Sequence, residues 1–133
     1  MRREAAEVVD MNIALWIAQI LLALIFIFAG VIKFVTPMDE MLKQMPISLP
    51  PAFLIFTGIV EVLGGLGVIL PWLLNIRPGL TPFAAVGLVI VMIGAVVYTI
   101  AAGDPAPALI PAAVGLLAAF VAWGRWRSKP AGK

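Results

Sequence analysis

The sequence predicts an all-α integral membrane protein, an antiparallel four-helix bundle with a short interfacial helix between helices 1 and 2. Two observations predict this fold class. Hydrophobic residues make up 63% of the 133 residues, charged residues make up 12%, and the mean hydropathy is +1.12, whereas soluble domains average roughly 45–50% apolar and about 25% charged residues. In addition, four apolar stretches approach the ~20 residues with which an α-helix crosses a bilayer. They predict helices at 13–33, 52–70, 80–100 and 106–123.

The segments outside these stretches are short, so we expect residues 1–133 to form a single membrane domain. This composition excludes soluble enzymes and nucleic-acid-binding proteins. The chain contains no Cys and no His, which excludes thiolate zinc sites, iron–sulfur clusters and the usual haem ligation. We therefore expect no metal site, no intrinsic cofactor and no redox chemistry from the side chains, which argues against an enzyme.

The first helix, at 13–33, carries its polar and small side chains on one face. The residues of this face follow one another in steps of four and three, as the helical repeat requires. In a membrane such faces pack against other helices, because polar groups avoid hydrocarbon. The face consists of Asn12, Trp16, Gln19, Ala23, Phe26, Gly30 and Lys33. The apolar run exceeds the roughly 7–15 residues of a signal-peptide core and lacks a convincing cleavage site, so we expect it to be retained.

The connection between helices 1 and 2 predicts a short helix at 37–45. Thr36 is expected to be its N-cap, Pro37 its first residue and Asp39 a carboxylate in its first turn. Its apolar residues recur at helical spacing, so the helix should lie flat on the membrane surface. These residues are Met38, Met41, Leu42 and Met45. The helix could be a lid over an entrance or only a connector.

Glu61 lies in the middle of the second helix, at 52–70. A charged side chain at the bilayer centre costs ~2.5–3.5 kcal/mol even on translocon-derived scales, so Glu61 should face the bundle and either be neutral or meet a partner. Candidate partners are Gln19, Thr57 and Lys33. Lys33 lies about 14 Å closer to the outer surface, so direct pairing needs a long reach, a tilt or water, and Lys33 could instead snorkel to the headgroups. Glu61 could form a proton, cation or polar-ligand site, or a hydrogen bond that fixes the register of the bundle.

The third and fourth helices are joined by only five residues, 101–105, which predicts an antiparallel hairpin. Small residues predict where the helices pack against one another. The glycines assigned to this packing are Gly30, Gly58, Gly64, Gly65, Gly87, Gly94 and Gly115. Tyr98 shares the face of Gly87 and Gly94 and lies near the outer level of Lys33. A small pocket that opens outward could be lined by Tyr98 and Lys33 together with Thr57 and Glu61.

The positive charges predict the orientation in the membrane. Most Lys and Arg residues fall on one side, which the positive-inside rule assigns to the cytoplasm. They are Arg2, Arg3, Arg77, Arg125, Arg127, Lys129 and Lys133. We therefore expect a multi-pass protein of the cell inner membrane with both termini in the cytoplasm. The tryptophans map near the same boundary, as expected of an aromatic belt, and these are Trp16, Trp72, Trp123 and Trp126.

Several segments resemble DoxX-like membrane proteins, and the likeness covers nearly the whole chain. The segments are Ala14-Leu15-Trp16, Gly30-Val31-Ile32-Lys33-Phe34, the run from Gly58 through Glu61-Val62-Leu63-Gly64-Gly65 to Pro71, Leu80-Thr81-Pro82 and Ala122-Trp123-Gly124-Arg125. The resemblance implies a four-helix bundle. Family members often carry a His near the outer end of the third helix, where this chain has Tyr98-Thr99, so a role that needs an imidazole is not implied here.

The family is named from a subunit associated with thiosulfate:quinone oxidoreduction in archaea, and some animal relatives help to assemble other membrane proteins. Our leading hypothesis is a small accessory or assembly subunit of a larger membrane complex, associated with respiratory or quinone-linked electron transfer. Its expected partners are other integral membrane proteins and the lipid bilayer. An alternative is a protein that binds a quinone or lipid-like ligand through Glu61, Thr57, Lys33 and Tyr98 and serves a membrane oxidoreductase.

A third hypothesis is a proton-coupled exporter of small molecules. The small multidrug-resistance transporters also have four short helices and a carboxylate within the membrane. Their carboxylate lies on the first helix, however, whereas Glu61 lies on the second, which disfavours this hypothesis.

Overall fold

The computed structural model describes residues 2–45, 47, 49–77, 79–103 and 105–127. All regular structure in these ranges is helical and none of it is strand, so the predicted fold class is confirmed. Within the same ranges, four helical segments are long and apolar enough to cross a membrane. The elements are α1 (Arg2–Val35), α2 (Met38–Gln44), α3 (Pro51–Gly67), α4 (Leu70–Leu73), α5 (Leu80–Ala101), the 3₁₀ turn η1 (Ala106–Ala108) and α6 (Leu109–Arg127).

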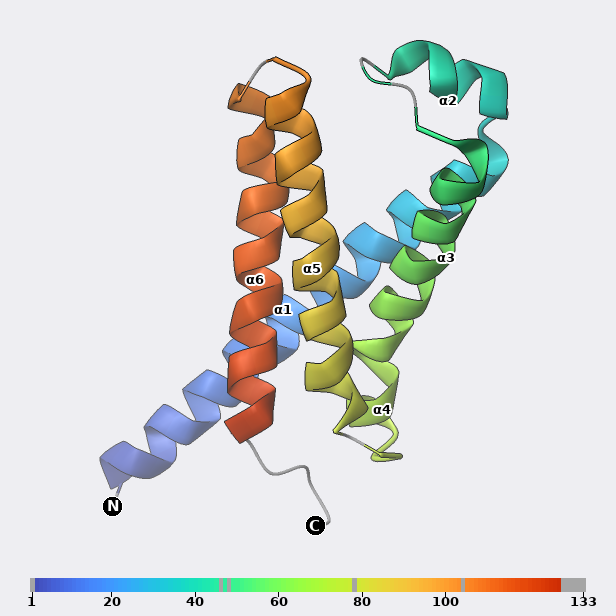
Figure 1. Cartoon of the computed structure of the whole chain (residues 1–133). Helices are drawn as coiled ribbons and strands as arrows, with labels where there is room; N and C mark the ends of the chain where they lie inside the picture. Colours follow the sequence, from blue (N-terminus) through green and yellow to red (C-terminus); the bar gives the residue numbers. More distant parts are fainter. Residues whose placement is uncertain (1, 46, 48, 78, 104, 128–133) are drawn as a thin grey trace.

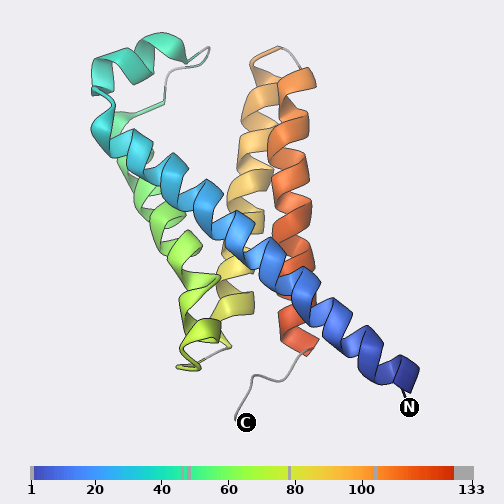
Figure 2. The same ribbon diagram turned by 180° about the vertical axis from the view of Figure 1, so that it is seen from behind.

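The four spans form two antiparallel pairs (Figure 1). α3 runs back along α1, and α5 and α6 form a hairpin. α1 crosses this hairpin diagonally, as Figure 2 shows from behind. The short helix α2 lies at one end of the molecule, which we call the α2 end (Figure 1). The start of α1 and the end of α6 lie at the opposite end, which we call the terminal end.

Several helix boundaries differ from the predicted ones; α6, for example, ends at Arg127 instead of residue 123. α1 begins at Arg2 instead of residue 13, because residues 2–12 are rich in Arg, Glu and Ala, which favour helix, and contain no Pro or Gly to stop it. The predicted helix at 52–70 ends at Gly67, and α4 follows at Leu70. Pro71 causes this break, because it has no N–H to donate to the carbonyl of Gly67.

The expected N-cap of the short helix is wrong by one residue. The residue before α2 is Pro37, in an extended conformation (φ −56°, ψ 138°), and its carbonyl accepts a hydrogen bond from the Met41 N–H at 3.1 Å. The Thr36 N–H instead donates to Ile32 O at 3.0 Å. Thr36 therefore continues the hydrogen bonding of α1 and is not free to begin α2.

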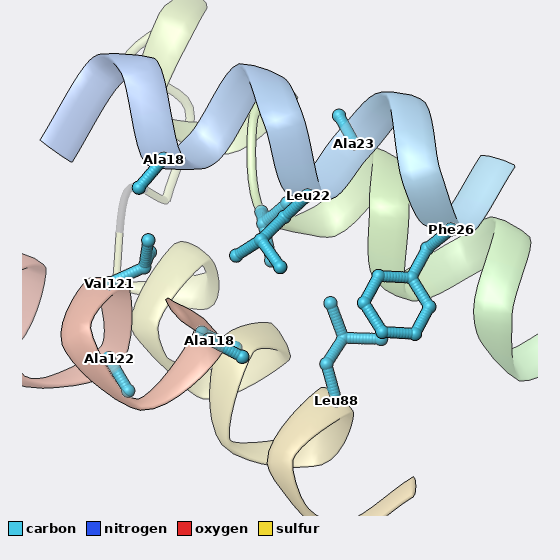
Figure 3. Packing of buried hydrophobic residues seen from close by; sticks show 10 residues of the cluster. Ala18, Leu22, Ala23, Phe26, Leu88, Ala118, Val121 and Ala122 are labelled. Carbon is cyan, nitrogen blue, oxygen red and sulfur yellow. The ribbon is translucent and has the colours of Figure 1, made fainter. Parts of the chain in front are cut away.

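The hydrophobic core lies where α1 crosses the hairpin (Figure 3). Leu22 and Phe26 of α1 pack there with Leu88 of α5 and with Ala118 and Val121 of α6, and all five are at most 2% exposed. Association of helices in lipid depends on close van der Waals packing, because lipid tails are as apolar as these side chains. The small side chain of Ala118 suits this packing, since it lets the backbones approach.

Glycines allow α1 and α3 to lie in close contact. A Cβ atom at Gly30 would lie 2.8 Å from the backbone O of Gly58 and 2.5 Å from Val62 Cγ2. A Cβ atom at Gly65 would lie 2.8 Å from Ile27 Cγ1. Any larger residue would separate the two helices.

α5 packs through a different face from the one predicted. Among the described residues, no heavy atom lies within 4 Å of a Cβ placed at Gly87 or Gly94, so the expected helix packing at these two glycines is wrong. The reason is that Leu88 of α5 packs over Gly64 of α3, where a Cβ would lie 2.5 Å from Leu88 Cδ2. One glycine, on α3, is enough for this contact. The buried residues of α5 are Thr81, Pro82, Ala85 and Leu88.

Candidate functional site

Lys33, Thr57 and Glu61 form a polar cluster between α1 and α3. Lys33 Nζ lies 2.7 Å from Glu61 Oε1 and donates a second hydrogen bond to Thr57 Oγ1 at 3.3 Å. The Thr57 hydroxyl in turn donates to Leu54 O at 2.9 Å. Glu61 is 7% exposed, whereas the side chain of Lys33 is 26% exposed. The cluster is therefore an ion pair with a buried acid and a partly accessible base.

The close contact of α1 and α3 explains why Lys33 reaches Glu61 directly. A Cβ at Gly58 would lie 3.4 Å from Lys33 Cβ, so Lys33 is level with Gly58. Glu61 is three residues further along α3, or about one turn. The depth expected from the sequence was too large, because it placed Lys33 level with the start of the second helix. Lys33 is instead level with Gly58, which lies seven residues after the first residue of α3.

One oxygen of Glu61 is not used by the protein. Oε1 accepts from Lys33, but Oε2 is buried and has no hydrogen-bond partner among the described residues. A carboxylate oxygen has room for two or more hydrogen bonds, and a buried one without a partner is energetically unfavourable. Oε2 can therefore accept a hydrogen bond from a bound hydroxyl or N–H group.

Gln19 does not contact Glu61 and belongs to a second polar cluster at the terminal end. Its Nε2 donates to Val68 O at 2.7 Å, and its Oε1 accepts from Arg125 Nε at 2.6 Å. Arg125 Nη1 donates to Asn12 Oδ1 at 2.8 Å. These bonds join α1 to α6 and to the break between α3 and α4. Gln19 is 0% exposed and Arg125 is 2% exposed, so these two side chains are buried.

Two indole rings enclose the guanidinium of Arg125. Its Cζ lies 4.4 Å from the ring centroid of Trp72 and 5.5 Å from that of Trp16. We expected Arg125 to be a charge at the membrane surface and the two tryptophans to belong to an aromatic belt, so this cluster was not predicted from the sequence. The signal was the polar face of the first helix, on which Asn12, Trp16 and Gln19 all required a partner.

Tyr98 lies away from the Lys33 cluster and bonds the loop that follows α2. Its hydroxyl donates to Ile47 O at 2.6 Å and accepts from the Ile47 N–H at 3.2 Å. Of the residues proposed for one pocket, the structure thus brings together Lys33, Thr57 and Glu61. Tyr98 and Gln19 form hydrogen bonds elsewhere.

Comparison with known protein families agrees with the four-helix architecture described above. The sequence model of the DoxX-like family matches residues 17–121. The chain belongs to the DoxX-like family. The match includes Lys33, Thr57 and Glu61, whereas Asn12 and Arg125 lie outside it. Neither the curated proteins nor the solved structures contain a match to this DoxX-like chain. With its four spans, it is a multi-pass membrane protein.

Proposed function

We propose that this DoxX-like protein is an accessory subunit, which packs beside another integral membrane protein and helps to assemble or hold a larger membrane complex. The observation that supports this proposal is an apolar groove on the surface of the α5–α6 hairpin, with a volume of about 370 Å³. The span Leu80–Ala101, which forms one wall of the groove, is the least buried of the four spans.

The two walls of the groove differ in the size of their side chains. α6 contributes the small residues Ala112, Gly115 and Ala119 beside Pro111 and Leu116, whereas all the lining residues of α5 are larger, such as Met92 and Val96. Transmembrane helices associate where small residues let their backbones approach. The occupant that fits is a transmembrane helix of a partner protein, with its side chains inserted along the Ala112–Ala119 wall.

Substitution in the groove tests this proposal. Ala119 lines the groove and Ala113 lies on the same helix outside it, and both are exposed, so Ala119→Phe and Ala113→Phe should fold alike. After solubilisation of native membranes in mild detergent, we expect the wild type and Ala113→Phe to co-purify with a membrane protein and Ala119→Phe to lose it. A chain that runs alone in every mild detergent contradicts the proposal. Loss of a homodimer only would assign the groove to a second copy of this chain.

A second candidate function is binding of a quinone or lipid-like ligand at Lys33, Thr57 and Glu61, in the service of a membrane oxidoreductase. The free Glu61 Oε2 supports it. Lys33 can donate to a quinone carbonyl, and Oε2 can accept from a quinol hydroxyl. The electrons would belong to the quinone and to the partner enzyme, because the side chains of this chain supply no redox group.

Binding of a short-chain ubiquinol analogue to the full chain in detergent tests the second function. Glu61→Gln should weaken binding, because the amide nitrogen cannot accept a hydrogen bond. Glu7→Gln, which changes an exposed acid on α1, should bind like the wild type. Equal binding by all three proteins would refute a ligand site at Glu61.

We further propose that the protein resides in the cell inner membrane with both termini in the cytoplasm, because most positive charges belong to the terminal end. The natural chain lacks Cys, so single cysteines can report the side of the membrane. Asp39→Cys in α2 should react with an impermeant maleimide applied to the outer face. Arg127→Cys at the end of α6 should react only after the membrane is opened. The reverse pattern would show the opposite orientation.

A further inference from the structure

Arg125 presents a buried positive charge that no carboxylate of the described residues balances. Lys33–Glu61 is the ion pair found in the described part of the chain. Arg125 is 2% exposed, and its partners are the neutral amides of Gln19 and Asn12. Its third nitrogen, Nη2, is buried and forms no hydrogen bond to any described residue. A buried cation without a counter-charge is unfavourable, so the site calls for an anion.

The surroundings of Arg125 hold its guanidinium in a fixed plane. Trp72 and Trp16 lie against it at 4.4 and 5.5 Å. Gln19 fixes Nε and is itself held by the backbone O of Val68. The remaining edge of the guanidinium is formed by Nη1 and Nη2, which point in the directions that suit the two oxygens of a phosphate or carboxylate group.

This edge can be opened from the surface. Nη1 is capped by Asn12, which is exposed on α1, so its short side chain can turn aside without disturbing the core. On α6, the neighbouring Trp123 and Trp126 are 50% and 66% exposed. Exposed indoles of this kind lie at the headgroup level of a bilayer. Arg125 lies between these two tryptophans in the sequence, so the edge that Asn12 caps is close to the layer that contains lipid phosphates.

We propose that Arg125 binds the phosphate group of an anionic phospholipid. Nη1 and Nη2 donate to two phosphate oxygens, and the Asn12 side chain leaves Nη1 when the lipid binds. The negative phosphate then supplies the counter-charge that the described residues do not provide at Arg125. Free inorganic phosphate has the same chemistry, but a lipid reaches the site from the membrane itself.

Lipid binding to the purified full chain tests the proposal by native mass spectrometry in detergent micelles, with dioleoylphosphatidylglycerol as the probe. Arg125→Met should weaken binding of the first lipid by about tenfold, since two charge-assisted hydrogen bonds are lost. Arg127→Met is the matched control, because Arg127 lies on the same helix, against Trp123 at 5.1 Å, and is exposed. It should change the affinity by less than about threefold.

Two further variants keep the proposal testable if Arg125→Met does not fold. Arg125→Lys keeps the charge between the indoles but loses the paired donors, so it should fold and still bind lipid more weakly than the wild type. Asn12→Ala removes only the cap and should bind at least as tightly as the wild type. The proposal is overturned if Arg125→Lys binds like Arg127→Met, if Asn12→Ala binds more weakly than the wild type, or if Arg125→Met and Arg127→Met lose equal affinity. Thermal stabilisation of the wild type by inorganic phosphate, without selective lipid binding, would overturn the lipid as the source.

Discussion

The Lys33 cluster and the Arg125 cluster lie on the same face of α1, separated by about 21 Å along its axis between Lys33 and Gln19. In the first, Lys33 and Glu61 pair directly at 2.7 Å, and the Lys33 side chain remains partly exposed. In the second, the buried Arg125 is held by amides and aromatic rings, and no acid among the described residues pairs with it.

This difference shows that α1 carries two polar clusters with different charge balance. The ion pair is electrically balanced within the chain, so it can contribute to the contact of α1 and α3 without a ligand. The Arg125 cluster is satisfied in hydrogen bonds except at Nη2 but is not balanced in charge. Leu22 and Phe26 fill the core between the two clusters, and this apolar layer keeps them separate.

Removal of the base from the ion pair should have the largest effect. Lys33→Met leaves the buried Glu61 carboxylate without a counter-charge, which should lower the free energy of unfolding by about 3 kcal/mol. Glu61→Gln should cost less, because Lys33 is partly exposed and can turn toward water. Reversible unfolding in mixed micelles with increasing dodecyl sulfate, followed by circular dichroism, measures both.

The double variant Lys33→Met, Glu61→Leu is the control for charge balance. Because both charges are gone, it should recover most of the stability lost in Lys33→Met. If Lys33→Met is as stable as the wild type, the pair contributes nothing, and the contrast between the clusters disappears.

Separation of α1 from α3 should have the next largest effect. In Gly30→Ala, the new Cβ would meet the backbone O of Gly58, which cannot move aside as a side chain would. We expect a loss of about 2 kcal/mol, measured by the same unfolding experiment. Gly87→Ala is the matched control: it has open space around it among the described residues and should be neutral or stabilising by ~0.5–1 kcal/mol. Equal losses for both variants would contradict the close contact at Gly30.

The sequence was sufficient to predict the fold, because the signals are strong and local. Stretches of apolar residues near the length of a membrane span predict the four spans, and five linking residues predict the hairpin. The apolar spacing of Met38, Met41 and Leu42 likewise predicts α2. The break at Pro71 could have been foreseen from the missing N–H, but the helix was expected to run through residue 70.

The candidate site was harder to predict because it depends on distances between helices. The sequence singles out Glu61 and lists Lys33 among its partners, but only the contact at Gly30 and Gly58 sets their relative depth. Arg125 was misjudged for a similar reason. A basic residue near the end of a span usually marks topology, and nothing local to α6 indicates that Trp16 and Trp72 enclose it.

Removal of the unbalanced charge should have a smaller effect than removal of the balanced one. Arg125→Met leaves the buried Gln19 Oε1 without its donor and removes the contact with two indoles, but it also removes an uncompensated charge. We expect a net loss of about 1–2 kcal/mol in lipid-free detergent. Arg127→Met should change stability by less than about 0.5 kcal/mol. A loss for Arg125→Met above that of Lys33→Met would mean that the charge at Arg125 is already balanced.

The smallest effect is expected at the α2 end, where the Tyr98 hydroxyl bonds Ile47 in the segment after α2. Tyr98→Phe removes both bonds to Ile47 and should cost about 0.5–1 kcal/mol locally, with little change in global stability. Hydrogen exchange of the Ile47 amide should become faster, while the amides in the middle of α5 stay protected. Thr99→Val is the matched control, because the Thr99 hydroxyl donates to Ala95 O at 2.8 Å within α5 and does not reach the loop. If the Ile47 amide exchanges equally in both variants, Tyr98 does not hold the loop. In that case the α2 end is held less tightly than the terminal end, where two indoles lie against Arg125.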